Sequence, residues 1–124
     1  MKTSKDYMAE ANAVVPRMPS DEAIAIHKAG NGVFVDVRDS SAIAQTGTIK
    51  GAQRIARGML EFVADADSGL HNPALEKDAA IYVVCAAGGQ AALAGKTLHE
   101  MGYTNVTNIG GISDWKEAGG ETEA

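Results

Sequence analysis

Residues 81–101 read IYVVCAAGGQAALAGKTLHEM, and this stretch decides the fold. Its first four residues are β-forming and largely apolar, which is typical of a strand covered on both faces of a parallel sheet. Small residues follow, and the segment 91–101 then spaces its apolar residues with the period of a helix. A strand that passes through a glycine loop into a helix is a building unit of α/β domains.

The same alternation extends over the rest of the chain. Longer β-rich runs occur at 33–37 and 105–107, and longer helical patterns at 21–29 and 112–118. Shorter elements are predicted as strands at 14–15 and 54–55, helices at 39–44 and 59–66, loops at 45–52 and 67–77, and a glycine turn at 110–111. We therefore expect an α/β fold with a small, mostly parallel central sheet and helices on both faces.

The length of the chain favours one domain. Its 124 residues leave no room for two ordinary domains, and 45% of them are apolar, a normal value for a globular core. Residues 4–12 are only weakly helical in pattern. We expect residues 1–12 to form an N-terminal arm or a short helix, and residues 13–124 to form a single domain.

Charge and cysteine content exclude several classes of function. The formal net charge is -5 and no Lys/Arg cluster is present, so neither nucleic acid nor an anionic membrane surface is an expected partner. Cys85 is the only cysteine, so no intramolecular disulfide can form. The first residues lack the apolar segment of a signal peptide, and no apolar run reaches membrane-spanning length. We expect a cytoplasmic protein whose cysteine stays reduced.

Cys85 lies where we expect the chemistry of the chain. It follows the strand at 81–84, and ligands of open parallel sheets bind beyond the carboxyl ends of the strands. The residues of the loop that follows are Ala86, Ala87, Gly88, Gly89 and Gln90. Their N–H groups can turn toward one point, and the next helix adds its own unpaired N–H groups and the positive end of its dipole. Such a site favours a thiolate over a thiol and stabilises an anion, and a persulfide is such an anion.

A purely structural role for Cys85 is the alternative. A lone cysteine at the end of an apolar strand is more often a small buried hydrophobic residue. Four small residues directly after Cys85 favour the reactive interpretation, because a structural turn from strand to helix needs fewer of them.

Five short motifs occur in a characteristic order and spacing. They are VDVR at 35–38, GTIKGA at 47–52, the cysteine and its glycine loop at 84–89, MGY at 101–103 and GGISDW at 110–115. Over about residues 21–120 the chain thereby resembles the rhodanese-like sulfurtransferases, a family with an α/β fold. The stretch RGMLEF, which begins at Arg57, is also similar to one bacterial single-domain branch of that family.

The resemblance implies a persulfide mechanism without a cofactor. In the family, the loop cysteine takes sulfane sulfur from a donor such as thiosulfate or a persulfide and passes it to a thiophilic acceptor, which is a small molecule, a thiol or another protein. By resemblance, Cys85 is the nucleophile and sulfur carrier, and the amides of Ala86 to Gln90 form its anion cradle. Asp36 and Arg38 are implied as structural support that ties the end of a strand to neighbouring loops.

The loop departs from the family pattern at the positions that carry charge. The family loop often reads Cys-Arg-x-Gly-x-Arg, whereas Ala86 and Gln90 stand at the arginine positions here. The usual Gly-His-Ile is Gly-Thr-Ile at 47–49, and Ala42 and Ile43 lie where a family carboxylate is expected. We expect persulfide formation to survive, because the backbone supplies the cradle, and thiosulfate to be used less efficiently.

Arg57 is a candidate for the missing cation. It follows a short predicted strand and stands at a predicted helix start, where a cation opposes the helix dipole. A solvated surface arginine is the other interpretation.

Several other functions compete with this one. A phosphatase or arsenate reductase needs an arginine six residues after the cysteine, where this chain has Ala91. The triplet Gly-Lys-Thr at 95–97 matches the end of a phosphate-binding P-loop, but Gln90 stands where that motif needs its first glycine. The three histidines are too scattered for a metal site. A non-catalytic rhodanese-like binding module and a persulfide carrier fed by a partner protein remain open alternatives.

Overall fold

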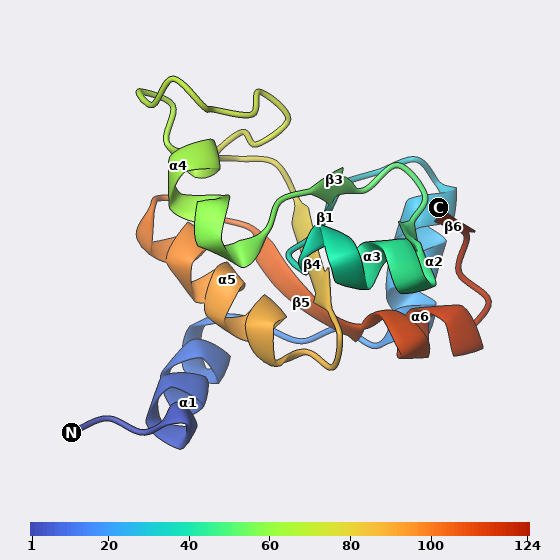
Figure 1. Cartoon of the computed structure of the whole chain (residues 1–124), viewed down its shortest axis with the longest axis horizontal. Coiled ribbons are helices and arrows are strands. Elements are labelled where there is room, and N and C mark those ends of the chain that lie inside the picture. Colours follow the sequence, from blue (N-terminus) through green and yellow to red (C-terminus); the bar gives the residue numbers. More distant parts are fainter.

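A four-stranded parallel sheet forms the centre of the computed structural model, which describes residues 1–124 (Figure 1). The strand order is β3-β1-β4-β5, with β1 at Val33–Asp36, β3 at Gln53–Arg54, β4 at Ile81–Cys85 and β5 at Val106–Gly111. Every pairing in this sheet is parallel, so the carboxyl ends of its strands lie at one edge. The predicted α/β fold with a mostly parallel sheet is confirmed.

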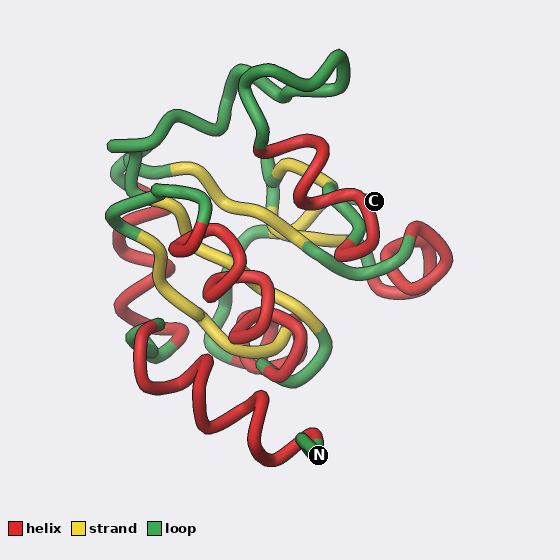
Figure 2. The backbone as a smooth tube through the Cα atoms, turned by 90° about the vertical axis from the view of Figure 1, so that its left-hand side faces the viewer, coloured by secondary structure: helices red, strands yellow, loops and turns green.

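Helices lie on both faces of the sheet, as Figure 2 shows. On one face, α2 (Ser20–Lys28) and α6 (Ile112–Glu117) contribute to an apolar core. On the other face, α4 (Leu60–Ala64) and α5 (Gly89–Glu100) contribute to a larger one. No helix combines the length and the apolar character that crossing a membrane requires.

Alternating residues of β4 feed the two cores. Ile81, Val83 and Cys85 belong to the core on the side of α5, whereas Val84 belongs to the core on the side of α2 and α6. This alternation follows from the two-residue period of a strand. It places the cysteine side chain on the face of the sheet that carries α5.

The first helix, α1 (Ser4–Val14), packs against α5 from outside (Figure 1). It begins with a capping box, in which Thr3 and Asp6 exchange hydrogen bonds. Gly95 of α5 allows the close approach at the other end, since a Cβ at this position would lie 2.9 Å from Val15 Cγ1. The glycine of the Gly-Lys-Thr triplet therefore serves helix packing.

The remaining elements are short. They are α3 (Ser40–Thr46), the 3-10 helix η1 (Arg57–Met59) and a two-stranded antiparallel sheet of β2 (Thr48–Ile49) and β6 (Thr122–Glu123).

Three local predictions differ from the structure. The predicted strand at 14–15 is wrong, because Val14 ends α1 and the N–H of Val15 still donates to Ala11 O. The loop predicted at 45–52 contains β2, whose partner β6 lies far along the chain and leaves no local pattern. The turn predicted at 110–111 is the end of β5, because Gly111 pairs with Cys85.

Candidate active site

Cys85 is the last residue of β4 and lies at the carboxyl edge of the sheet. The register between β4 and β5 shifts between Val83 and Cys85, and such an irregularity turns the end of a strand and re-aims its side chain. Cys85 is only 1% exposed, whereas the next two residues, Ala86 and Ala87, are exposed. The thiol therefore lies beneath the surface of the loop.

Two backbone amides donate to the sulfur of Cys85. The N–H of Gly88 lies 3.0 Å from Sγ, and the N–H of Ala91 lies 3.3 Å from it. Gly88 has a φ of +102°, which side-chain-bearing residues rarely adopt and which turns the chain back toward the sulfur. Ala91 is in the first turn of α5, whose N–H groups have no acceptor within their own helix. These donors and the positive end of α5 stabilise negative charge on Sγ.

Only one of the predicted cradle residues donates a hydrogen bond to the sulfur of Cys85. Among Ala86 to Gln90, Gly88 alone donates to Sγ, and Ala91 joins it from outside the predicted set. Gly89 and Gln90 are the first two residues of α5, so their N–H groups also lack an acceptor within the helix. The side chain of Gln90 is exposed to solvent.

Asn108 of β5 holds the loop in place. Its Nδ2 donates to Gly88 O at 3.0 Å, and its Oδ1 accepts from the N–H of Gly110 at 2.8 Å. The side chain is 1% exposed, so both hydrogen bonds are protected from water. Asn108 therefore connects the residue that donates to Cys85 with the end of the neighbouring strand.

Arg17 brings a cation to the same loop. Its Nη2 lies 3.0 Å from the position that a Cβ on Gly88 would occupy, and 3.4 Å from the corresponding position at Gly110. The backbone of Arg17 forms an isolated parallel bridge with Asn108, which fixes where this segment lies along β5. A guanidinium group thus packs on a loop that contains no arginine of its own.

Arg57, the predicted candidate cation, is held by two other side chains. Its guanidinium donates to Glu61 Oε1 at 3.0 Å and to Thr97 Oγ1 at 2.9 Å, and the side chain is 30% exposed. Burial alone would raise the pKa of Glu61, but hydrogen bonds from its own backbone amide and from Arg57 hold that pKa below its ordinary value. The donors of Arg57 do not reach Sγ.

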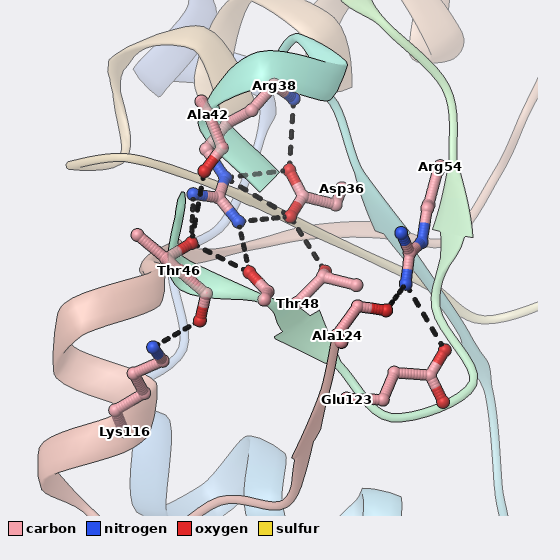
Figure 3. A network of polar contacts seen from close by, with 10 residues as sticks. Asp36, Arg38, Ala42, Thr46, Thr48, Arg54, Lys116, Glu123 and Ala124 are labelled. Carbon is pink, nitrogen blue, oxygen red and sulfur yellow. Dashed lines mark hydrogen bonds and ion pairs between the residues drawn. The ribbon is translucent and has the colours of Figure 1, made fainter. Parts of the chain in front are cut away.

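Asp36 and Arg38 form a buried ion pair near the end of β1 (Figure 3). Arg38 Nη2 lies 2.7 Å from Asp36 Oδ2, and both side chains are at most 4% exposed. Arg38 also donates to Thr46 Oγ1 and Gly47 O, and the hydroxyl of Thr48 donates to Asp36 at 2.7 Å. These contacts join the end of β1 to α3 and β2. Thr48, which stands where the family usually has a histidine, therefore supplies a further hydrogen-bond donor to the buried carboxylate of Asp36.

Most of the chain matches the model of a known protein family. The family model described as "Rhodanese-like domain" matches residues 20–118. The chain belongs to the rhodanese-like family. Its matched region starts with α2 and ends just after α6, so it includes the whole parallel sheet and leaves α1 outside.

Relatives of this rhodanese-like chain include sulfurtransferases. It is 30% identical to the thiosulfate sulfurtransferase GlpE of Pseudomonas putida, over 81% of this chain and 84% of that protein. It is 29% identical to the polysulfide-sulfur transferase homodimer of Wolinella succinogenes, with a TM-score of 0.75 over 96% of this chain and 85% of that chain.

A third relative carries a different description. A protein of unknown function from Rhodopseudomonas palustris, described as "Possible Tyrosine Phosphatase", is 38% identical. Its TM-score is 0.93, over 99% of this chain and 96% of that chain. The similarity therefore includes α1, in contrast to the family model.

Sequence reasoning missed Ala91, Asn108 and Arg17. Ala91 is the sixth residue after the cysteine and lies in the first helical turn, so the helix-start argument could have included its amide. The signal for Asn108 was a polar residue inside a β-rich run that leads into two glycines. Nothing in the local pattern around Arg17 places it beside Gly88.

Proposed function

We propose that this rhodanese-like chain is a sulfurtransferase that carries sulfane sulfur as a persulfide on Cys85. The observation that carries the proposal is the pair of N–H groups, from Gly88 and Ala91, that donate to Sγ at 3.0 and 3.3 Å. Backbone donors that stabilise a thiolate equally suit a persulfide, whose negative charge lies on the outer sulfur. The sulfurtransferase relatives support the same class of reaction.

Loading and transfer need no cofactor. The Cys85 thiolate attacks the outer sulfur of thiosulfate, the sulfur–sulfur bond of the donor breaks, and sulfite leaves with the bonding electron pair. The product is the persulfide anion of Cys85, and the N–H groups of Gly89 and Gln90 in the first turn of α5 are the donors that we assign to its outer sulfur. A thiophilic acceptor then attacks that outer sulfur and returns Sγ to the thiolate.

The absence of arginine from the loop affects which sulfur donor can load Cys85. Ala86 and Gln90 provide no cation for the anionic leaving group, and Arg17 supplies one only from beside Gly88. We therefore propose that thiosulfate is a weak donor, and that a small organic or protein-bound persulfide is a better one. A reducing compartment such as the cytoplasm suits this cycle, since it keeps the single cysteine reduced.

Phosphatase chemistry is not proposed for this chain. Such chemistry needs an arginine to hold the oxyanion, and the corresponding residue here is Ala91, which is buried. Its contribution to the site is the N–H group that donates to Sγ.

Steady-state sulfur transfer to a thiol, with thiosulfate and with an organic persulfide as donors, tests the proposal. Cys85→Ser is the decisive variant, because serine is nearly isosteric and leaves the loop backbone unchanged. We expect activity with at least one donor in the wild type and none in Cys85→Ser, with equal far-UV circular dichroism. Substantial activity in Cys85→Ser would refute the mechanism, and an inactive wild type would favour a non-catalytic module.

A further inference from the structure

A groove of about 520 Å³ lies between α1 and α5. Its walls include Tyr7 and Met8 of α1, Arg57 of η1, and Gly89, Leu93 and Lys96 of α5. Figure 1 shows α1 beside α5 near the end at which α5 begins. The groove therefore combines apolar side chains from two helices with two cations, and the carboxylate of Glu100 also lines it.

The groove starts beside the cysteine loop. The lining residues of α5 run from Gly89 to Glu100 at helical spacing, so they form one stripe along the helix. Gly89 follows Gly88, whose N–H donates to Cys85 Sγ. With a rise of about 1.5 Å per residue, Lys96 lies roughly 10 Å along the stripe from Gly89. A molecule with one end at the loop can thus extend toward the cations.

The charges of the groove favour an anionic group. Lys96 and Arg57 are 29% and 30% exposed, and each is paired at 3.0 Å with the carboxylate of the residue four positions further along the chain, Glu100 or Glu61. These carboxylates are 62% and 51% exposed, so each can turn into water at little cost. An incoming carboxylate can therefore replace them.

The apolar wall favours a ligand with a hydrocarbon body. Tyr7 is 52% exposed, although it lines the groove together with Met8 and Leu93. Covering such surface removes apolar area from water, which favours binding. Tyr7 and Met8 belong to α1, so this part of the wall lies outside the region 20–118 that the family model matches, whereas Leu93 lies within it.

We propose that this groove binds the body of an acceptor thiol that carries a carboxylate at its far end, and thereby selects which thiol receives sulfur from Cys85. The proposal rests on the proposed function, because the groove matters to transfer only if Cys85 carries a persulfide. The Cys85 persulfide anion first takes up a proton from water, the acceptor thiolate then attacks its outer sulfur, and the bond from that sulfur to Sγ breaks. The electron pair stays on Sγ as a thiolate, and the proton leaves with the transferred sulfur as the new persulfide.

Matched acceptors test the selection. The Cys85 persulfide is prepared with thiosulfate or an organic persulfide, and its decay is followed with mercaptohexanoate or aminohexanethiol, which share a chain length and differ in end charge. We expect the second-order rate constant of this decay to favour the carboxylate by about tenfold, as for one partly buried charge-assisted contact. Lys96→Glu should remove or reverse that preference, whereas Lys28→Glu, the same charge change at an exposed residue of α2, should keep it.

The apolar wall has its own test. Tyr7→Ala should reduce the preference for mercaptohexanoate over the shorter mercaptopropionate, because less apolar surface is then covered.

Equal preference for the two end charges in the wild type, or equal ratios in Lys96→Glu and Lys28→Glu, would overturn the proposal while leaving the persulfide mechanism standing.

A binding titration separates the two proposals. The S-methyl derivative of mercaptohexanoate cannot react with sulfur, so its affinity reports on the groove alone. We expect binding to the wild type and about tenfold weaker binding to Lys96→Glu, the loss of one charged contact. This result stands even if Cys85 takes up no sulfur. Equal affinity of both proteins would overturn the groove proposal directly.

Discussion

Asn108→Asp is expected to damage sulfur transfer by moving one loop amide. The substitution keeps the shape of the side chain and the acceptor for the N–H of Gly110, but it replaces the Nδ2 donor that lies 3.0 Å from Gly88 O. Two acceptor oxygens would then face each other in a site where Asn108 is 1% exposed. Gly88 must shift to separate them, and its N–H moves away from Cys85 Sγ.

The magnitude follows from the two hydrogen bonds involved. A buried carbonyl left without a donor costs about 1–3 kcal/mol, which appears as lower stability. Loss of one charge-assisted hydrogen bond to the sulfur anion costs about 1.5–3 kcal/mol, or roughly ten- to a hundredfold in rate. We therefore expect kcat/KM for sulfur transfer to fall by that factor, together with a modest fall in Tm.

A steady-state assay beside a thermal melt measures both effects. Asn105→Asp is the matched control, because it makes the same chemical change at an exposed position just before β5. We expect the control to retain both the activity and the Tm of the wild type. If Asn108→Asp lowers Tm but keeps kcat/KM within about twofold of the wild type, the link from Asn108 through Gly88 to the sulfur is wrong.

Two further substitutions test other parts of the account. Gln90→Arg should raise kcat/KM for thiosulfate by about tenfold or more, because it adds a cation in the first turn of α5 for the departing sulfite. It should raise kcat/KM for an organic persulfide donor much less. Equal gains with both donors would indicate a general effect on the thiolate instead. Arg38→Met should lower the free energy of unfolding by about 3–5 kcal/mol, because it leaves the carboxylate of Asp36 buried without its cation. Chemical denaturation measures this free energy. A change below about 1 kcal/mol would show that the hydroxyl of Thr48 and the backbone N–H of Arg38 suffice to hold the carboxylate.

The sequence predicts those parts of the fold that depend on local pattern. The run IYVV, the small residues after Cys85 and the helical spacing that follows all lie within one segment, and the structure forms β4, a loop and α5 there. The sheet order and the position of β6 beside β2 depend on pairing between distant segments. Neither is contained in the pattern of any single segment.

The site was predictable to the same extent. Cys85 and its loop follow from the order of residues, whereas the contact of Asn108 with Gly88 depends on the register of β5 beside β4. The position of Arg17 depends on how the segment after α1 runs along β5. The high β-propensity of the valines at 14–15 favours a strand, but Val14 completes the last turn of α1, and the extended Val15 packs against Gly95 of α5 without pairing in the sheet.

The central claim is that Cys85 carries the transferred sulfur, and intact mass spectrometry tests it most directly. The wild type and Cys85→Ser are incubated separately with thiosulfate and with an organic persulfide, without an acceptor. The account predicts that the wild type gains the mass of one sulfur atom with at least one donor, that an added thiol removes this mass, and that Cys85→Ser gains nothing. A wild type that gains no sulfur from either donor, or a gain that persists in Cys85→Ser, would contradict it.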